Sequence, residues 1–120
     1  MIVFVYGSLK QGFHNHRLME GATYVGEGTI AAAAMFSLGS FPAVVHGTGV
    51  VYGEMWEVSG AQAQALDRLE GHPTFYRREE LLVELSDGEL HTAWVYIYQG
   101  DTNHSRPIPS GDWTHEEVGK

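Results

Sequence analysis

The sequence predicts an α+β fold in one domain over residues 1–120: a small, curled or barrel-like mixed β-sheet with one main helix. Strand-like segments predominate along the chain, and only residues 61–70 combine strong helix propensity with a start and a stop signal. Fifteen glycines supply the turns that a strand-rich chain needs. Because exposed sheet edges invite aggregation, we expect the sheet to curl or close on itself.

The first expected strand is the continuous apolar run at residues 2–6, which is typical of a strand buried on both faces. It ends in a loop, residues 7–12, with a glycine at each end. Such a junction offers backbone N–H groups to a ligand. The loop has P-loop spacing, but Phe13 and His14 follow it instead of Lys and Ser or Thr, so it does not predict a nucleotide site.

The next segments predict a short helical piece at residues 14–20 and then an extended stretch at residues 22–38, with bends or bulges at its glycines. A turn at residues 39–42 precedes a short apolar piece, and a second turn is expected at residues 47–49. Both turns contain glycine, which predicts that the chain reverses or breaks at each of them.

A strand is expected at residues 50–58, where alternate residues share one face and place Glu54 among apolar neighbours. A buried carboxylate without a partner is costly. We therefore expect one of three arrangements: the face lines a cavity, Glu54 is paired, or the strand carries a bulge.

The main helix has recognisable ends. Ser59 is a good N-cap, and after Glu70 the helix stops, because Gly71 tolerates a left-handed cap and Pro73 cannot donate the next hydrogen bond. Glu70 then faces the negative end of the helix dipole, which disfavours its charge. Desolvation would raise its pKa further, toward the range useful for proton transfer near pH 7. The alternative for this stretch alone is a surface glutamate with an ordinary pKa.

The last elements form a predicted hairpin. Residues 77–85 and 90–98 are extended, and the Asp-Gly pair at residues 87–88 is a strong hairpin signal. The second of these strands is apolar on both faces, as expected of a central or barrel strand. Residues 110–113 carry one large apolar anchor, and the tail from about residue 114 is expected to fray.

Composition excludes several classes of function. Fifteen acidic residues against seven Lys and Arg give a net charge of -8, and no basic stripe is present, so nucleic acids and anionic membranes are not expected partners. The chain has no cysteine, which removes disulfides, thiol nucleophiles and cysteine-ligated zinc. Without a signal-peptide pattern or an apolar run of membrane-spanning length, we expect a cytoplasmic protein.

Three motifs follow one another along the chain. They are the loop Tyr6-Gly7-Ser8-Leu9-Lys10, the pair Gly53-Glu54, and Leu66-Asp67-x-x-Glu70-Gly71 followed by Tyr76-x-Arg78. Together they resemble the γ-glutamylcyclotransferase-like family over residues 3–98. The short form of the loop, with Lys10, Gly12, Asn15 and His16 after it, is most similar to the γ-glutamylamine cyclotransferase branch. Longer γ-glutamylcyclotransferases have an extra Asn in this loop, so their substrate preference does not transfer.

The resemblance implies a fold, a site and a reaction. It implies a curled, barrel-like sheet, no metal, no cofactor, and a cavity for a small γ-glutamyl substrate. The expected reaction is attack of the substrate α-amine on its own γ-carbonyl, which gives 5-oxoproline and a free amine or amino acid. Glu70 is the expected general base and acid, and the expected substrate-binding residues are Tyr6, Gly7, Ser8, Leu9 and Tyr76.

For several residues the sequence allows two interpretations. Tyr76 either lines the pocket or is a core tyrosine, and Arg78 either binds a substrate carboxylate or, as we favour, forms an ion pair with Asp67, Glu79 or Glu80. Glu54 is a second acid or, more in keeping with its strand, a hydrogen-bonded structural residue. His14 and His16 are two apart but have no acid with them, so His16 is expected to support the loop rather than bind a metal.

The function also keeps an alternative. A non-catalytic member of the family would retain the pocket as a binding or regulatory module. A cavity filled by side chains would favour that alternative, whereas Glu70 in an open cavity favours the enzyme. The sequence leaves open which γ-glutamyl compound is the substrate and how many copies of the chain assemble.

Overall fold

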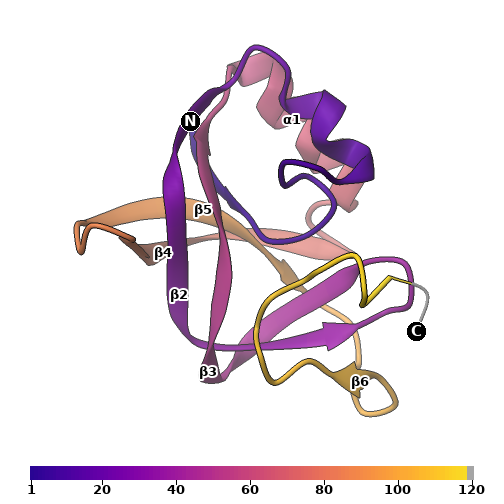
Figure 1. The fold of residues 1–120 in the computed structure, drawn as a ribbon. Coiled ribbons are helices and arrows are strands. Elements are labelled where there is room, and N and C mark those ends of the chain that lie inside the picture. Colours follow the sequence, from indigo (N-terminus) through magenta and orange to yellow (C-terminus); the bar gives the residue numbers. More distant parts are fainter. Residues whose placement is uncertain (119–120) are drawn as a thin grey trace.

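Five strands close into a small barrel in the computed structural model, which describes residues 1–118 (Figure 1). The strands of the chain are β1 (Ile2–Val5), β2 (Thr23–Ser37), β3 (Pro42–Glu57), β4 (Tyr76–Leu85), β5 (Leu90–Tyr98) and the short β6 (Arg106–Pro107). Their order is β3-β1-β5-β4-β2-β6, and β2 also pairs with β3, which closes the ring. β1 is parallel to β5 and the other pairs are antiparallel. The predicted α+β fold with a mixed, barrel-like sheet is confirmed.

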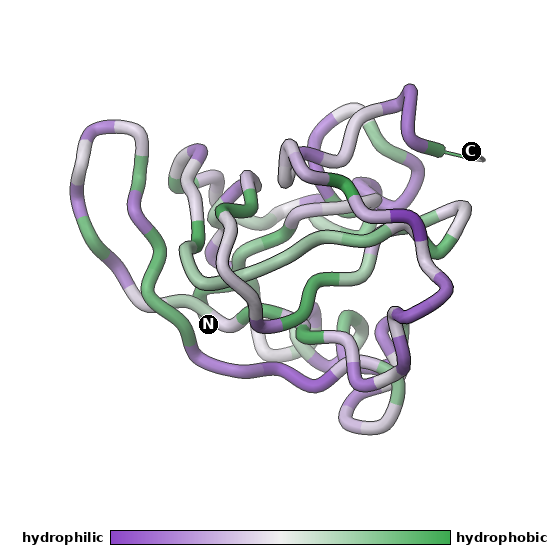
Figure 2. Tube along the Cα trace, turned by 90° about the horizontal axis from the view of Figure 1, so that it is seen from below, coloured by the Kyte–Doolittle hydropathy of each residue, from purple (hydrophilic) through white to green (hydrophobic). Residues whose placement is uncertain are grey.

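The strands feed two hydrophobic clusters, one on each side of the sheet. In β1, Phe4 belongs to the first cluster, whereas Val3 and Val5 belong to the second. In β5, Val95 and Tyr96 are divided in the same way. Figure 2 shows hydrophobic segments running through the middle of the molecule and hydrophilic ones in the outer loops. Burial on both faces, predicted for these two strands, is therefore confirmed.

Two helical segments cover the second cluster: the 3₁₀ helix η1 (His14–Met19) and the α-helix α1 (Gly60–Glu70). From η1, Met19 is buried in this cluster, and from α1, Leu66 is fully buried in it. Within residues 1–118, neither helix has the length and apolar character needed to cross a membrane.

The ends of α1 follow the predicted signals. The Ser59 hydroxyl accepts a hydrogen bond from the N–H of Gln62 (3.1 Å), and the Gln62 side chain accepts one from the N–H of Ser59 (2.9 Å), which is a capping box. Gly71 adopts the left-handed conformation at φ 65°, ψ 36° and stops the helix directly after Glu70. Local sequence signals therefore determine both ends of α1, and they place Glu70 as its last residue.

We expect Ser59→Ala to lower the free energy of unfolding by about 1 kcal/mol, because the N–H of Gln62 loses its acceptor. Urea unfolding followed by circular dichroism measures the change. The matched control is Ser59→Asp, which keeps an acceptor and is expected to unfold close to the wild type. Equal midpoints for Ser59→Ala and the wild type would show that the cap contributes nothing.

The predicted turn at residues 47–49 is wrong, because β3 is one continuous strand. Gly47 lies against β2 at a point where a Cβ added to it would stand 2.8 Å from the Cβ of Ala34. At the same place β2 is irregular, with Ala32 at φ 54° and register shifts around Ala33. The glycine therefore permits close approach of two strands rather than a reversal of the chain.

The face of β3 that contains Glu54 is less buried than its apolar residues predict, although Glu54 has hydrogen-bond partners, as one of the three expected arrangements requires. Val51 and Met55, on the opposite face of β3, are fully buried, whereas Val50 and Tyr52 are about half exposed. Burial on the Glu54 face begins only at Trp56. Because the barrel closes on the other face, Glu54 is partly exposed and does not stand among buried apolar side chains.

The C-terminal segment returns to the barrel. Trp113 is the buried anchor expected for this segment, at 1% exposure. Of the tail expected to fray, residues 114–118 are described, and His115 and Glu117 contact other parts of the chain. The ring of His115 stacks on Phe13 with 4.1 Å between centroids, and Glu117 pairs with Arg106 at 2.8 Å. Residues 119–120 lie outside the described residues.

Candidate active site

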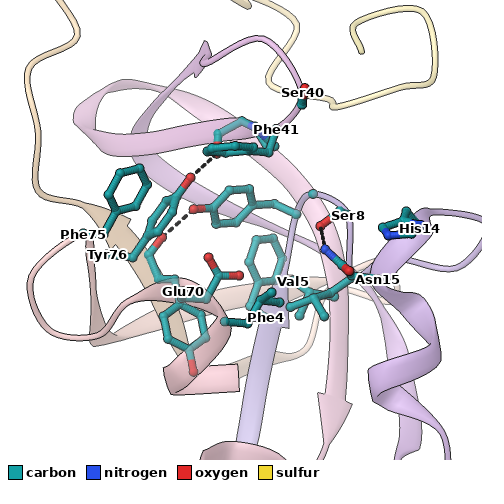
Figure 3. Close-up of a pocket in the computed structure, with 16 residues that line it drawn as sticks. Phe4, Val5, Ser8, His14, Asn15, Ser40, Phe41, Glu70, Phe75 and Tyr76 are labelled. Atoms are coloured by element: carbon teal, nitrogen blue, oxygen red, sulfur yellow. Dashed lines mark hydrogen bonds between the residues drawn. The ribbon is translucent and has the colours of Figure 1, made fainter. Parts of the chain in front are cut away.

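A cavity of about 400 Å³ opens where the end of β1, the β2–β3 turn and the C-terminal end of α1 meet (Figure 3). Its lining comes from segments far apart in the sequence. It includes all six residues predicted for the site: Tyr6, Gly7, Ser8, Leu9, Glu70 and Tyr76. The fold therefore brings the predicted site residues together around one open space.

The loop after β1 is held in shape by η1. Asn15 donates twice to Ser8, from its backbone N–H to the carbonyl (3.0 Å) and from its amide to the hydroxyl (2.9 Å). The His16 ring donates from Nδ1 to the carbonyl of Leu9 at 2.9 Å. Gly7 approaches Pro42 so closely that an added Cβ would lie 2.9 Å from the proline ring. Asn15 and His16 thus support the loop, as expected for His16.

The outer side of the loop is held by Glu54 and Lys10. One Glu54 oxygen accepts hydrogen bonds from the backbone N–H of Gln11 (3.0 Å) and from the indole of Trp56 (3.1 Å). Lys10 is buried and donates to the carbonyl of Trp113 at 2.6 Å. Glu54 does not line the cavity, but lies at a separate cleft with Lys10. Its contacts are those of a structural residue.

Glu70 is the acidic residue of the cavity. It is the last residue of α1, and Figure 3 shows its carboxyl group directed into the cavity. Burial raises the pKa of Glu70 from 4.5 to about 7. A carboxyl group with this pKa is protonated and ionised in comparable amounts near neutral pH. It can both accept and donate a proton, which a solvated glutamate does poorly at that pH.

Tyr6 and Tyr76 form the wall beside Glu70. The Tyr76 hydroxyl donates to the carbonyl of Pro42 at 2.6 Å, and the Tyr6 hydroxyl donates to the carbonyl of Tyr96. Burial, together with the nearby Glu70, raises the pKa of Tyr76, so this phenol stays neutral. Tyr76 is 4% exposed and also lines the cavity, so its two interpretations are not exclusive.

Arg78 lies outside the cavity lining. Its guanidinium donates two hydrogen bonds to Asp67, at 2.7 and 3.0 Å, and lies over the ring of Trp94 at 5.1 Å. The favoured interpretation, a structural ion pair, matches this geometry, and Asp67 is the partner. The Tyr96 hydroxyl donates to the same carboxylate at 2.7 Å.

Sequence reasoning did not assign the residues at the mouth of the cavity to the site. Phe41, Leu69 and Phe75 line it with 39%, 43% and 46% of their surfaces exposed. The rings of Phe41 and Phe75, from the two sides of the mouth, lie 6.3 Å apart. We call these three residues the apolar rim. Phe41 and Phe75 lie in connections just before β3 and β4, where no periodic pattern marks a residue, and Leu69 lies in the last turn of α1.

The cavity contains few charged groups. Among residues 1–118 its lining has no lysine or arginine, and the ionisable side chains are those of Glu70, His14 and three tyrosines. In the same part of the chain, no group of three or more His, Asp or Glu side chains is placed to hold a metal ion. Proton transfer by Glu70 is the chemistry that these residues offer.

Comparison with known proteins shows the family. Residues 3–115 match the model described as gamma-glutamyl cyclotransferase, AIG2-like. A putative gamma-glutamylcyclotransferase from Vibrio cholerae is 36% identical over 113 residues, which cover 93% of this chain and 94% of that protein. The chain belongs to the γ-glutamyl cyclotransferase, AIG2-like family.

Two further similarities are to a relative with a named activity and to a protein of known structure. The gamma-L-glutamyl-butirosin B gamma-glutamyl cyclotransferase of Niallia circulans is 31% identical over 106 residues, which cover 82% of this chain and 67% of that protein. The crystal structure of an AIG2-like protein from Mus musculus has a TM-score of 0.85 at 24% identity and covers 99% of this chain and 94% of that one. The second similarity shows the fold. The resemblance to the γ-glutamylamine cyclotransferase branch remains a prediction.

Proposed function

We propose that this chain is a γ-glutamyl cyclotransferase that converts a γ-glutamyl amine or amino acid into 5-oxoproline and a free amine. The observation that carries the proposal is Glu70, a carboxyl group at an open cavity whose burial raises its pKa to about 7. Membership of the cyclotransferase family supports the reaction type.

In this mechanism the substrate supplies both reacting groups. A C–N bond forms between the α-nitrogen and the γ-carbon, and the bond from the γ-carbon to the leaving nitrogen breaks. Because both groups belong to one molecule, the enzyme mainly holds the attacking conformation. Glu70 takes protons from the α-ammonium and returns them to the leaving nitrogen. The α-nitrogen loses two protons and the leaving nitrogen gains two, so none is consumed.

The loop after β1 would hold the charged parts of the substrate. The backbone N–H groups of Gly7, Ser8 and Leu9 donate to no protein acceptor within residues 1–118, and all three residues line the cavity. Such N–H groups suit the substrate α-carboxylate or the oxyanion that develops at the γ-carbonyl. The contacts from Asn15 and His16 keep them in place.

The rim favours amines as leaving groups. A leaving amino acid would carry a carboxylate to an apolar rim in a cavity that, within residues 1–118, has no lysine or arginine in its lining. A carboxylate placed there loses water without gaining a partner. We therefore expect γ-glutamylamines to react better than γ-glutamyl amino acids or glutathione. The Niallia relative, named for γ-L-glutamyl-butirosin B, widens the candidates to larger amines.

The alternative function, a binding module without catalysis, was expected to show a cavity filled by side chains. The cavity of about 400 Å³ is open, and the Glu70 carboxyl is directed into it (Figure 3). This observation favours the enzyme.

The test is release of 5-oxoproline from a panel of γ-glutamyl-ε-lysine, other γ-glutamylamines, γ-glutamylalanine and glutathione. We expect 5-oxoproline and free amine in equal amounts, with the amines as better substrates. In ¹⁸O-labelled water the product should carry no label, because water takes no part in ring closure. Labelled glutamate would show hydrolysis instead, and a folded protein inactive on the whole panel would contradict the proposal.

Replacing Asn15 tests the support of the loop. Asn15→Ala removes the amide that holds the Ser8 hydroxyl. One lost hydrogen bond is worth about 1 kcal/mol, so we expect KM to rise about fivefold with a smaller change in kcat. The matched control is Asn103→Ala, an exposed asparagine that does not line the cavity. If both variants had the same KM, the loop would not depend on Asn15.

A further inference from the structure

Three tyrosines line the cavity with Glu70, one directly after β1, one at the start of β4 and one in β5, yet none donates its hydroxyl to the Glu70 carboxylate. Each hydroxyl has another acceptor: Tyr6 the carbonyl of Tyr96, Tyr76 the carbonyl of Pro42 at 2.6 Å, and Tyr96 the carboxylate of Asp67 at 2.7 Å. Within residues 1–118, burial is the cause of the raised pKa of Glu70, and no hydrogen bond to its carboxylate contributes to it. A buried carboxylate with no donor is poorly stabilised in its charged form.

Asp67 is the one acceptor of the three that is a side chain. It precedes Glu70 by three residues on α1, so the two carboxyl groups are neighbours on one face of the helix. Tyr96 lines the cavity with Glu70, and burial, the hydrogen bond to Asp67 and, less strongly, the nearby Glu70 carboxylate all raise the pKa of the Tyr96 phenol. It pairs with Asp67, which Arg78 holds with two hydrogen bonds. The Arg78 hydrogen bonds also keep the pKa of Asp67 below its usual value, so Asp67 is an ionised acceptor at neutral pH.

We propose that Asp67 is a positioning residue for the proton-transfer group: by accepting the Tyr96 hydroxyl, it keeps that donor away from the Glu70 carboxylate. This inference rests on the proposed function of Glu70. The Asp67–Arg78 ion pair then has two roles: it joins α1 to β4, and it holds the acceptor of the Tyr96 hydroxyl in place. Without Asp67, the Tyr96 hydroxyl would turn to the next carboxylate on the helix face, and Glu70 would become a weaker base.

Other ionisable groups near Glu70 come from every element around the cavity. They are Tyr6 at the end of β1, Tyr76 on β4, Tyr96 on β5, His14 on η1, and, behind Tyr96, Asp67, Arg78 and His72. Removing Asp67 alone would therefore change charge as well as hydrogen bonding. The test has to separate these two effects.

The test measures the pKa of Glu70 directly, by ¹³C NMR titration of labelled glutamate carboxyls, with Glu70→Gln to assign the signal. Asp67→Leu with Arg78→Met removes the ion pair without leaving one charge unpaired. We expect this pair variant to lower the pKa of Glu70 by about 1, the effect of one hydrogen bond to a charged group. With Tyr96→Phe added, the pKa should return to the wild-type value.

Equal pKa changes with and without the Tyr96 hydroxyl would overturn the proposal, because they would arise from charge alone. If the pair variant fails to fold, the pKa of Glu70 in the single variant Tyr96→Phe provides a second test. We expect it to leave the pKa of Glu70 unchanged, and a rise would show that the hydroxyl donates to Glu70 in the wild type. Where turnover is measurable, the acid limb of the pH–rate profile should move with the titration. If no γ-glutamyl compound reacts, the proposed function fails, while the titration still decides the role of Asp67.

Discussion

Glu70→Gln is expected to lower the rate of 5-oxoproline release at least 100-fold. The amide keeps the shape of the side chain but cannot take a proton from the substrate ammonium, and general acid–base catalysis contributes roughly 10²–10⁴-fold. In the wild type the rate should rise as the pH passes through about 7, because only the ionised carboxylate accepts a proton. The measurement is kcat over pH 5–9 with the best substrate of the panel.

The matched control for this substitution is Glu80→Gln. Glu80 is an exposed residue of β4 that does not line the cavity, so its substitution is expected to leave turnover within about twofold of the wild type. Turnover by Glu70→Gln comparable to that of the wild type would exclude Glu70 as the base.

The same substitution should make the protein more stable at high pH. The pKa of Glu70 is about 7 in the folded chain, against 4.5 for the free side chain, so the folded state binds this proton more tightly. That contribution to stability is complete below pH 4.5 and is lost as the pH rises through 7. The free energy of unfolding of the wild type should fall by up to about 3 kcal/mol across this window, whereas Glu70→Gln has no such loss.

Urea unfolding at pH 5 and pH 8 measures this effect, with Glu80→Gln again as the control. The quantity to compare is the change in unfolding free energy between the two pH values, because constant effects of the substitution cancel. We expect Glu80→Gln to follow the wild type and Glu70→Gln to lose the dependence. Parallel curves for all three proteins would contradict a raised pKa at Glu70.

The position of Glu70 was predictable because local residues determine it. The cap at Ser59, the left-handed Gly71 and Pro73 after it place the end of the helix within a few residues. The strands that are buried on both faces were predictable in the same way, from their composition.

The path of β3 was not predictable, because it depends on contacts between strands. Gly47 has the local signature of a turn, but its neighbour across the strand, Ala34, makes it a place of close approach. The apolar face of this strand was assigned to the side of Glu54, whereas closure of the barrel buries the side of Val51 and Met55. Alternation along a strand gives two faces, and only the partner strands decide which one is inside.

The contacts around Glu70 also could not be predicted from the sequence. Phe41 and Phe75 meet across the mouth although they come from different connections of the chain. The hydroxyl of Tyr96 donates to Asp67, which lies 29 positions away in the chain and also accepts hydrogen bonds from Arg78. Residue types identify such groups as candidates, but their pairing is decided by the fold.

The hydrogen bond from Lys10 to the carbonyl of Trp113 has a consequence for synthesis of the chain. It joins the loop of the site to a residue 103 positions downstream. When residues 7–12 and all of α1 have emerged from the ribosome, the segment around Trp113 that binds Lys10 has not yet been made. The binding loop therefore gains this hydrogen bond only after Trp113 has been made, so a nascent chain that stops before Trp113 would carry Glu70 beside a loop that lacks its anchor.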